Sequence, residues 1–160
     1  MNQLSFRKAN KSDVELYFTW ANDPLVREQS FNSNLVVWDE HIKWFLEKLN
    51  DVNCHFYLFK NLENQYVGQV RIQQMDDFNA VIGVSVDALH RGSGCGSSML
   101  KLATIDFLND KPNMVINAFI KEENLVSKFI FEKAGFNFKE LMDYQNFKSY
   151  HYIKNADRKI

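Results

Sequence analysis

The segment Arg91-Gly92-Ser93-Gly94-Cys95-Gly96 joins two stretches of opposite structural preference. The preceding run, Val81-Ile82-Gly83-Val84-Ser85-Val86, is rich in β-branched residues and predicts a strand, whereas residues 97–103 predict a helix. A glycine-rich turn that opens a helix presents backbone N–H groups at the positive end of the helix dipole, and its glycines let the backbone approach a ligand. The segment therefore predicts a site for a phosphate-bearing ligand, with Arg91 as a further donor.

The spacing of the glycines excludes two familiar phosphate loops. A P-loop needs a Lys after its last glycine, but Ser97 and Ser98 follow Gly96. The dinucleotide pattern G-x-G-x-x-G lacks its third glycine, because Ser97 occupies that position. Taken alone, the segment leaves open a plain glycine turn without a ligand.

A second segment, residues 117–136, narrows the choice. It places Asn124 ahead of a helical stretch that ends at Glu132-Lys133-Ala134-Gly135-Phe136. In order and spacing, the two segments resemble the two signatures of the GNAT superfamily of acyl-CoA-dependent N-acyltransferases. The resemblance is good over residues 65–140 and looser over residues 1–64.

This resemblance implies both a fold and a ligand. The implied fold is α/β (α+β): a mixed, mostly antiparallel seven-stranded sheet that splays between its fourth and fifth strands, with helices on both faces, built as one domain from residues 1–160. The implied ligand is acetyl-CoA, an acyl donor that lies in the opening between those strands. A ligand at a sheet crevice beside a helix start also agrees with the general behaviour of α/β proteins.

Composition limits other functions. The 160 residues carry a net charge of −1, so we expect no broad basic surface for nucleic acid. No apolar run approaches the roughly 20 residues of a membrane span, and no signal peptide opens the chain. The two cysteines, Cys54 and Cys95, lack metal-ligand spacing and suggest a reducing compartment. We therefore expect a cytoplasmic protein that binds no metal, membrane or nucleic acid.

Periodicity and turn residues predict the individual elements. Ser12 with Glu15 forms a possible capping box, and Gly135 is suited to end a helix in the left-handed conformation. The predicted strands are residues 4–8, 55–59, 66–75, 80–86, 114–119, 136–142 and 149–153, and the predicted helices are residues 12–21, 25–29, 38–49, 96–108 and 125–134.

The resemblance also implies which residues contact the donor. The backbones of Val84 and Val86 face it, and the Val86 N–H polarises the thioester carbonyl. Asn124 resembles the residue that binds the pantetheine arm, with a helix cap as the alternative, and Ser127 follows one turn later. The pyrophosphate turn corresponds to Arg91, Gly92, Ser93, Gly94, Cys95, Gly96 and Ser97.

Phe131 departs from the family pattern. Many GNAT enzymes have a Tyr there, whose hydroxyl is thought to protonate the leaving thiolate, and Phe has no proton to donate. Ser127, Tyr144 and Tyr150 are candidates to replace it by their proximity in the implied fold, and water is the alternative. Phe131 still corresponds to a residue beside the coenzyme.

The acceptor side is less defined by sequence. His41 is the candidate general base, with a structural histidine between aromatic residues as the alternative. Arg27 and Trp44 are candidates to contact the acceptor, by pairing with a diphosphate and by stacking. Asp76 follows the third strand, where acceptors often enter, and a solvated turn is its alternative.

Three functions remain open. The N-terminal half is similar, more loosely, to GNAT enzymes that acetylate nucleotide-linked amino sugars, as in the pseudaminic acid pathway. That similarity makes a small-molecule amine or nucleotide sugar the expected partner. A GNAT enzyme acting on a protein N-terminus or lysine, as on ribosomal proteins, is the second candidate. A non-catalytic acyl-CoA-binding module is the third, and an exposed C-terminal edge strand suggests a homodimer.

Overall fold

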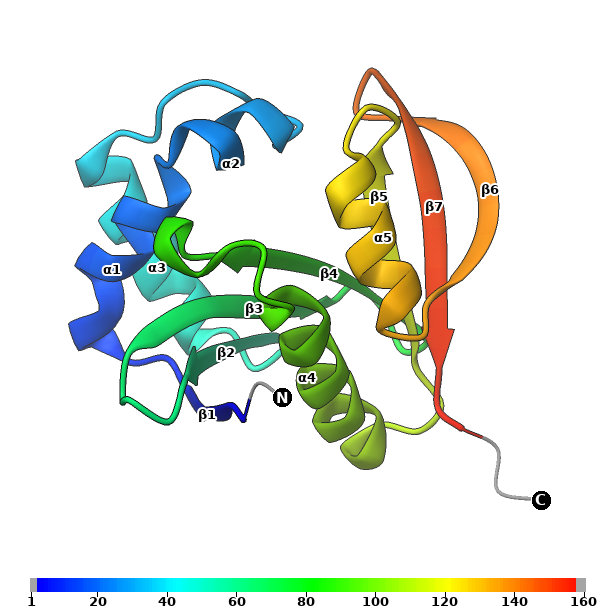
Figure 1. Ribbon diagram of the computed structural model, residues 1–160, viewed down its shortest axis with the longest axis horizontal. Helices are drawn as coiled ribbons and strands as arrows, with labels where there is room; N and C mark the ends of the chain where they lie inside the picture. The colour runs from blue at the N-terminus through cyan, green and yellow to red at the C-terminus, as the bar shows by residue number, and fades with distance from the viewer. Residues whose placement is uncertain (1–2, 158–160) are drawn as a thin grey trace.

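The computed structural model of the protein describes residues 3–157 (Figure 1). Its strands are β1 (Ser5–Lys8), β2 (Cys54–Lys60), β3 (Tyr66–Gln74), β4 (Asn79–Val86), β5 (Val115–Lys121), β6 (Asn137–Tyr144) and β7 (Phe147–Asn155). Its helices are α1 (Val14–Ala21), α2 (Pro24–Gln29), α3 (Trp38–Asn50), α4 (Cys95–Asp110) and α5 (Leu125–Lys133), with short 3₁₀ turns η1 (Lys11–Asp13) and η2 (Ala88–His90). Every predicted element is present, and no boundary differs from its prediction by more than two residues.

The strands form one seven-stranded sheet in the order β1-β2-β3-β4-β5-β7-β6. β4 and β5 are parallel, and the other neighbouring strands are antiparallel. The predicted mixed, mostly antiparallel sheet is confirmed.

Two hydrophobic clusters cover opposite faces of this sheet, because side chains alternate along each strand. On one face, Tyr57 and Ile72 pack with Met99 and Phe107 of α4. On the other face, Phe56 and Leu58 of β2 pack with residues of α1 and α3, among them Tyr17, Trp20 and Phe45. We call the second side, covered in part by α1, α2 and α3, the N-terminal face (Figure 1).

The sheet opens between β4 and β5. These strands pair at only three positions, Asn79–Val115, Ala80–Ile116 and Val81–Asn117, and then diverge (Figure 1). The splay predicted between the fourth and fifth strands is therefore confirmed. We call the part of β4 beyond the last pair, Ile82–Val86, the unpaired edge.

Caps define where several helices begin and end. The capping box before α1 is formed by Asn10 and Asp13, not by Ser12 and Glu15, because the chain first makes the turn η1. Asp23 caps α2 by accepting from the N–H groups of Leu25 and Val26. Gly135 follows α5 with φ of +92°, which confirms the predicted left-handed end of that helix.

Candidate functional site

The unpaired edge directs backbone groups toward β5. Phe78 O accepts from Val115 N at 2.7 Å and Ala80 O accepts from the Asn117 side chain at 3.1 Å, so the backbone groups of these even-numbered residues point toward β5. Asp87 N donates to Val67 O at 2.8 Å, so an odd-numbered residue faces β3. Because backbone direction alternates along a strand, Ile82, Val84 and Val86 continue toward β5 where the pairing has ended. Their N–H and C=O groups are placed to bind an extended polar ligand.

The glycine segment brings a helix start to the end of this edge. Gly92 has φ of +76° and Gly94, the N-cap residue of α4, has φ of +83°, a region that favours glycine. No side chain among the described residues caps this helix, so its first N–H groups stay available to an anion. Ser97 Oγ donates to Gly94 O at 3.2 Å and Ser93 Oγ lies 3.1 Å from Cys95 Sγ. The segment meets the requirements of a phosphate-binding turn.

Gly96 fits helix α4 closely against its neighbours. A Cβ atom at Gly96 would lie 3.1 Å from Ile130 Cδ1 on α5 and 3.4 Å from Val86 Cγ2. The absence of a side chain therefore lets the start of α4, the end of β4 and helix α5 meet at one place.

Arg91 already has a carboxylate partner. Its Nη2 donates to Asp23 Oδ1 at 2.7 Å, on the same side chain that caps α2. Burial opposes ionisation of Asp23, but the hydrogen bonds from Arg91, Val26 N and Leu25 N and the charge of Arg91 together outweigh it and lower the pKa of that carboxyl. Trp20 Nε1 also donates to Asp87 Oδ1 at 2.8 Å, just after β4. These two contacts fix the N-terminal helices to the turn that precedes α4.

Three residues predicted to contact acetyl-CoA lie at the N-cap of helix α5 and along it: Asn124, Ser127 and Phe131. Asn124 Oδ1 accepts from Ser127 N at 3.2 Å, which is a helix cap, and Asn124 Nδ2 donates to Ser127 Oγ at 3.0 Å. Phe131, one turn after Ser127, is buried and packs edge-on against Phe136. Asn124 thus has the cap function that was its alternative, and Ser127 Oγ can still donate its own proton.

The N-terminal face of β4 has an open position at Gly83. An added Cβ there would meet no atom within 4 Å. Gly83 lies opposite Arg71 of β3 and two residues beyond the last β4–β5 pair. A second molecule can therefore approach the unpaired edge over Gly83.

Arg71 is a cation without an anionic partner on this face. The guanidinium of Arg71 makes no hydrogen bond or ion pair with any described residue, and its Cζ lies 5.1 Å from the ring centroid of Trp44. Burial lowers the pKa of Arg71. The guanidinium nitrogens have no partner and are not fully enclosed, so solvent reaches them. The nearby Tyr17 Oη, in contrast, is fully enclosed and makes no hydrogen bond. Arg71 was not among the residues predicted from the sequence, although a charged residue within a predicted strand was a usable signal.

Lys121 is a second buried cation, at the end of β5. It is 5% exposed, its Nζ donates to Glu28 O at 3.1 Å and the same Nζ lies 3.9 Å from the ring centroid of Phe147. Among the described residues no carboxylate is paired with it. Phe119, two residues earlier, stacks on Tyr144 with ring centroids 4.0 Å apart, so the predicted residue Tyr144 lies on this wall of the opening.

His151 lies beside Phe119 and has a defined tautomer. Asn117 Nδ2 donates to Ala80 O and Val115 O, which turns Asn117 Oδ1 toward His151 Nε2 at 2.8 Å. Nε2 must therefore carry the proton. His151 Nδ1 is enclosed without a hydrogen bond, 3.8 Å from Glu140 Oε1, and burial lowers the pKa of the ring. The ring is a neutral base beside the opening.

Other predicted acceptor residues lie elsewhere. His41 is 2% exposed between α1 and α3, and its Nε2 lies 2.9 Å from Val14 O. Arg27 donates to the carbonyls of Ala21, Asn32 and Asn34, within its own loop region. Trp44 packs edge-on against Phe56 and under Arg71. Of the three, only Trp44 contacts a residue near Gly83.

Asp76 lies in the turn between β3 and β4, where it accepts from Phe78 N and Asn79 N at 2.8 and 2.7 Å. Asp76 precedes Asn79, the first residue of β4, and Val86 lies on the order of 23 Å from Asn79 along the strand at about 3.3 Å per residue. The structure therefore does not bring Asp76 to the unpaired edge.

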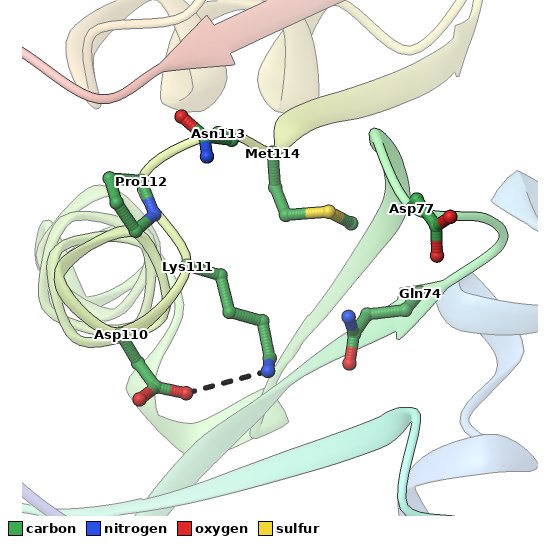
Figure 2. A pocket seen from close by; sticks show the side chains of 7 residues that line it. All are labelled: Gln74, Asp77, Asp110, Lys111, Pro112, Asn113 and Met114. Carbon is green, nitrogen blue, oxygen red and sulfur yellow. Dashed lines mark ion pairs between the residues drawn. The ribbon is translucent and has the colours of Figure 1, made fainter.

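A surface hollow of about 300 Å³ lies near that same end (Figure 2). It is lined by Gln74, Asp77, Asp110, Lys111, Pro112, Asn113 and Met114. Lys111 Nζ and Asp110 Oδ2 form an ion pair of 3.5 Å across its wall (Figure 2). Since the hollow adjoins the C-terminal end of α4, the whole helix separates it from the glycine segment.

Membrane-spanning helices and metal-binding clusters are both absent from residues 3–157. No helix in this range is sufficiently long and apolar to cross a membrane. Nor do three or more His, Cys, Asp or Glu side chains in this range group together to hold a metal ion.

Comparison with known proteins identifies the family. A family model described as an acetyltransferase (GNAT) domain matches residues 3–137. An uncharacterized protein of Methanocaldococcus jannaschii is 26% identical over 137 residues, which is 84% of this chain and 28% of that protein. The chain thus spans little more than a quarter of this relative's length.

Solved structures share the fold. A domain from Methanocaldococcus jannaschii has a TM-score of 0.81 at 23% identity, covering 98% of this chain and 100% of that one. Spermidine N-acetyltransferase from Vibrio cholerae, in complex with CoA and spermine, has a TM-score of 0.83 at 14% identity, covering 94% of each chain. Aminoglycoside acetyltransferase AAC(6')-Ib, in complex with ribostamycin and coenzyme A, has a TM-score of 0.81 at 16% identity, covering 96% of this chain and 93% of that one. Because the family model matches most of its length, the chain belongs to the GNAT acetyltransferase family.

Proposed function

We propose that the protein transfers the acetyl group of acetyl-CoA to a primary amine by direct attack. One observation carries this proposal: the unpaired edge of β4 ends at an uncapped helix start. The N–H groups at Cys95, Gly96 and Ser97 would hold the pyrophosphate, and the backbones of Val84 and Val86 would hold the pantetheine arm and the thioester. CoA in the structures of two neighbours supports this choice of donor.

The reaction needs few groups beyond these. The amine nitrogen forms a bond to the carbonyl carbon, and the carbon–sulfur bond breaks. The Val86 N–H stabilises the charge that develops on the carbonyl oxygen. The nitrogen loses one proton and the thiolate gains one, so the products are an amide and free thiol. Holding amine and thioester together supplies much of the rate.

The proton transfers are assigned as proposals. His41, the residue expected from the sequence, stays a candidate base, but its Nε2 is engaged by Val14 O. His151 is a second candidate, because its ring stacks on Phe119 beside the opening. Ser127 Oγ and Tyr144 Oη are the candidates to protonate the thiolate in place of a tyrosine at Phe131.

A small-molecule amine is the proposed acceptor, and the amino group of a nucleotide-linked amino sugar is our first choice within that class. The amines bound in the structures of two neighbours, spermine and the aminoglycoside ribostamycin, support an amine acceptor. Trp44 and the free cation Arg71 beside it support an acceptor with a flat, anionic part. Acetylation of a protein N-terminus or lysine is the second candidate.

A non-catalytic acyl-CoA-binding module remains a specific alternative, because Phe131 cannot act as an acid. Thiol release from acetyl-CoA, measured with a UDP-linked 4-amino-6-deoxy sugar, peptides with free N-termini and spermidine, separates these functions. Release with the sugar supports the first choice, and release with peptides alone supports the second. Coenzyme binding without release for any amine would establish the module.

Three wider expectations accompany this proposal: one domain over residues 1–160, a homodimer through edge strand β6, and a cytoplasmic location. Light scattering of the purified protein tests the dimer, and fractionation of the source cells tests the location.

A further inference from the structure

The N-terminal face beside the opening carries positive charge that no carboxylate neutralises. Arg71 has no hydrogen-bonded partner among the described residues, and Lys121 has only the Glu28 carbonyl and the Phe147 ring. Arg71 of β3 is paired with Gly83 of β4, and the Cα atoms of such a pair are about 5.5 Å apart. Lys121 lies on β5, four residues beyond Asn117, on the other side of the opening. Arg71 therefore comes from one side of the opening and Lys121 from the other.

The acidic side chains nearby are either occupied or exposed. Asp23 pairs with Arg91, and Asp87 accepts from Trp20 and lies 3.2 Å from His90. Glu140 is the carboxylate closest to His151, and its side chain is 54% exposed. The Arg71 guanidinium is reached by solvent and has no described anionic partner, so it is available to an anion.

We propose that the acceptor is an amine that also carries an anionic group, a phosphate or a carboxylate, bound by Arg71 with support from Lys121. This inference rests on the proposed acetyl transfer and narrows its substrate. The amine lies over Gly83 at the thioester, and the anionic group lies beside Arg71. Polyamines and aminoglycosides are cations, and this face repels them.

The test compares acceptors matched except for charge. One pair is glucosamine 6-phosphate against glucosamine, and the other is β-alanine against its amide, with spermidine as a cationic reference. We expect kcat/KM to favour the anionic member of at least one pair by about 10- to 100-fold, the size of a charged hydrogen bond. The pair that shows the preference distinguishes phosphate from carboxylate.

Variants assign the preference to its residue. Arg71→Gln abolishes the preference for the anionic member by raising the KM for that member, while kcat for the neutral member stays the same. Arg71→Lys restores part of the preference. Lys154→Gln is the matched control, because Lys154 is a partly buried cation that donates to Thr104 and Ala134 away from Gly83. Lys121→Met serves as the second test if Arg71→Gln does not fold. Equal or better turnover of glucosamine, β-alanine amide and spermidine would overturn the proposal.

Binding separates this inference from the proposed function. With the donor site saturated by coenzyme A, glucosamine 6-phosphate and β-alanine are titrated calorimetrically against their neutral counterparts. Tighter binding of an anionic member, lost in Arg71→Gln, supports the anion site even if no amine is acetylated, whereas acetylation without any charge preference supports the transferase alone. No difference in binding within either pair refutes the anion site.

Discussion

Gly83 offers the most discriminating perturbation, because filling it should separate stability from activity. Its side-chain position points to the N-terminal face, as do those of its odd-numbered neighbours on β4, and an added Cβ meets nothing within 4 Å. We therefore consider Gly83→Val, which fills the approach to the unpaired edge and whose Cβ meets no neighbouring atom within 4 Å.

The magnitudes follow from the geometry. Glycine within a strand is destabilising by about 0.5–1 kcal/mol relative to alanine, and β-branched residues suit a pleated strand. Gly83→Val should thus raise the free energy of unfolding by about 0.5–1 kcal/mol. The backbone groups of Val84 and Val86 keep their direction, so acetyl-CoA affinity stays unchanged. Displacing the amine by about 1 Å reduces kcat/KM by about 100-fold.

Urea unfolding, calorimetric titration of acetyl-CoA and thiol release measure the three quantities on one preparation. Gly68→Ala is the matched control, because its Cβ would lie 2.4 Å from Ser85 O and 2.8 Å from Met99 Cε, and it should lose stability. Full activity in a folded Gly83→Val variant would refute an approach over Gly83. Loss of stability would refute the open position itself.

Three further predictions concern the turn, the α5 cap and an ion pair. Gly94→Ala places a side chain at φ of +83°, so we expect the free energy of unfolding in urea to fall by about 1–2 kcal/mol and coenzyme binding by calorimetry to weaken. No change in either quantity would contradict a phosphate-binding turn that requires glycine at this position. Asn124→Ala removes the cap on Ser127 N and should cost about 1 kcal/mol with a higher KM for acetyl-CoA, and unaltered stability would argue against the cap. Burial opposes ionisation of Asp13, but the hydrogen bonds from Arg7 and Asn10 N and the charges of Arg7 and Lys60 together outweigh it and hold the pKa of that carboxyl below 3.8. The stabilisation by the ionised carboxylate is therefore present above pH 3.8 and is lost as pH falls through the folded pKa. Asp13→Asn should therefore cost about 1–3 kcal/mol at neutral pH, by thermal or urea unfolding, and the difference from wild type should shrink in acid; a constant difference at all pH values would contradict it.

The fold was predictable because its signals are local. Strand, glycine turn and helix around Gly94 depend on neighbouring residues, and the end of α5 at Gly135 depends on one glycine's conformational freedom. The position of the opening also followed, through the resemblance to the GNAT superfamily. Only the capping box moved, since Asn10 competes with Ser12 for the same turn.

The acceptor side was less predictable because it depends on contacts distant in sequence. Arg27 has a charge suited to a diphosphate, but three carbonyls that the loop folds around it accept its hydrogen bonds. Arg71 becomes a free cation because its side chain lies beside Trp44 and no acidic residue within 3–157 pairs with it. His151 gains its fixed tautomer from Asn117, which lies 34 positions earlier.

The most direct test of acetyl transfer at the unpaired edge is mass spectrometry of the acceptor panel after incubation with acetyl-CoA, using wild type and Gly83→Val side by side. We expect wild type to give an N-acetylated amine with an equal amount of free thiol, and Gly83→Val to bind acetyl-CoA equally well but form about 100-fold less product. Wild type that binds acetyl-CoA and acetylates no amine, or a Gly83→Val variant that acetylates as fast as wild type, would contradict it.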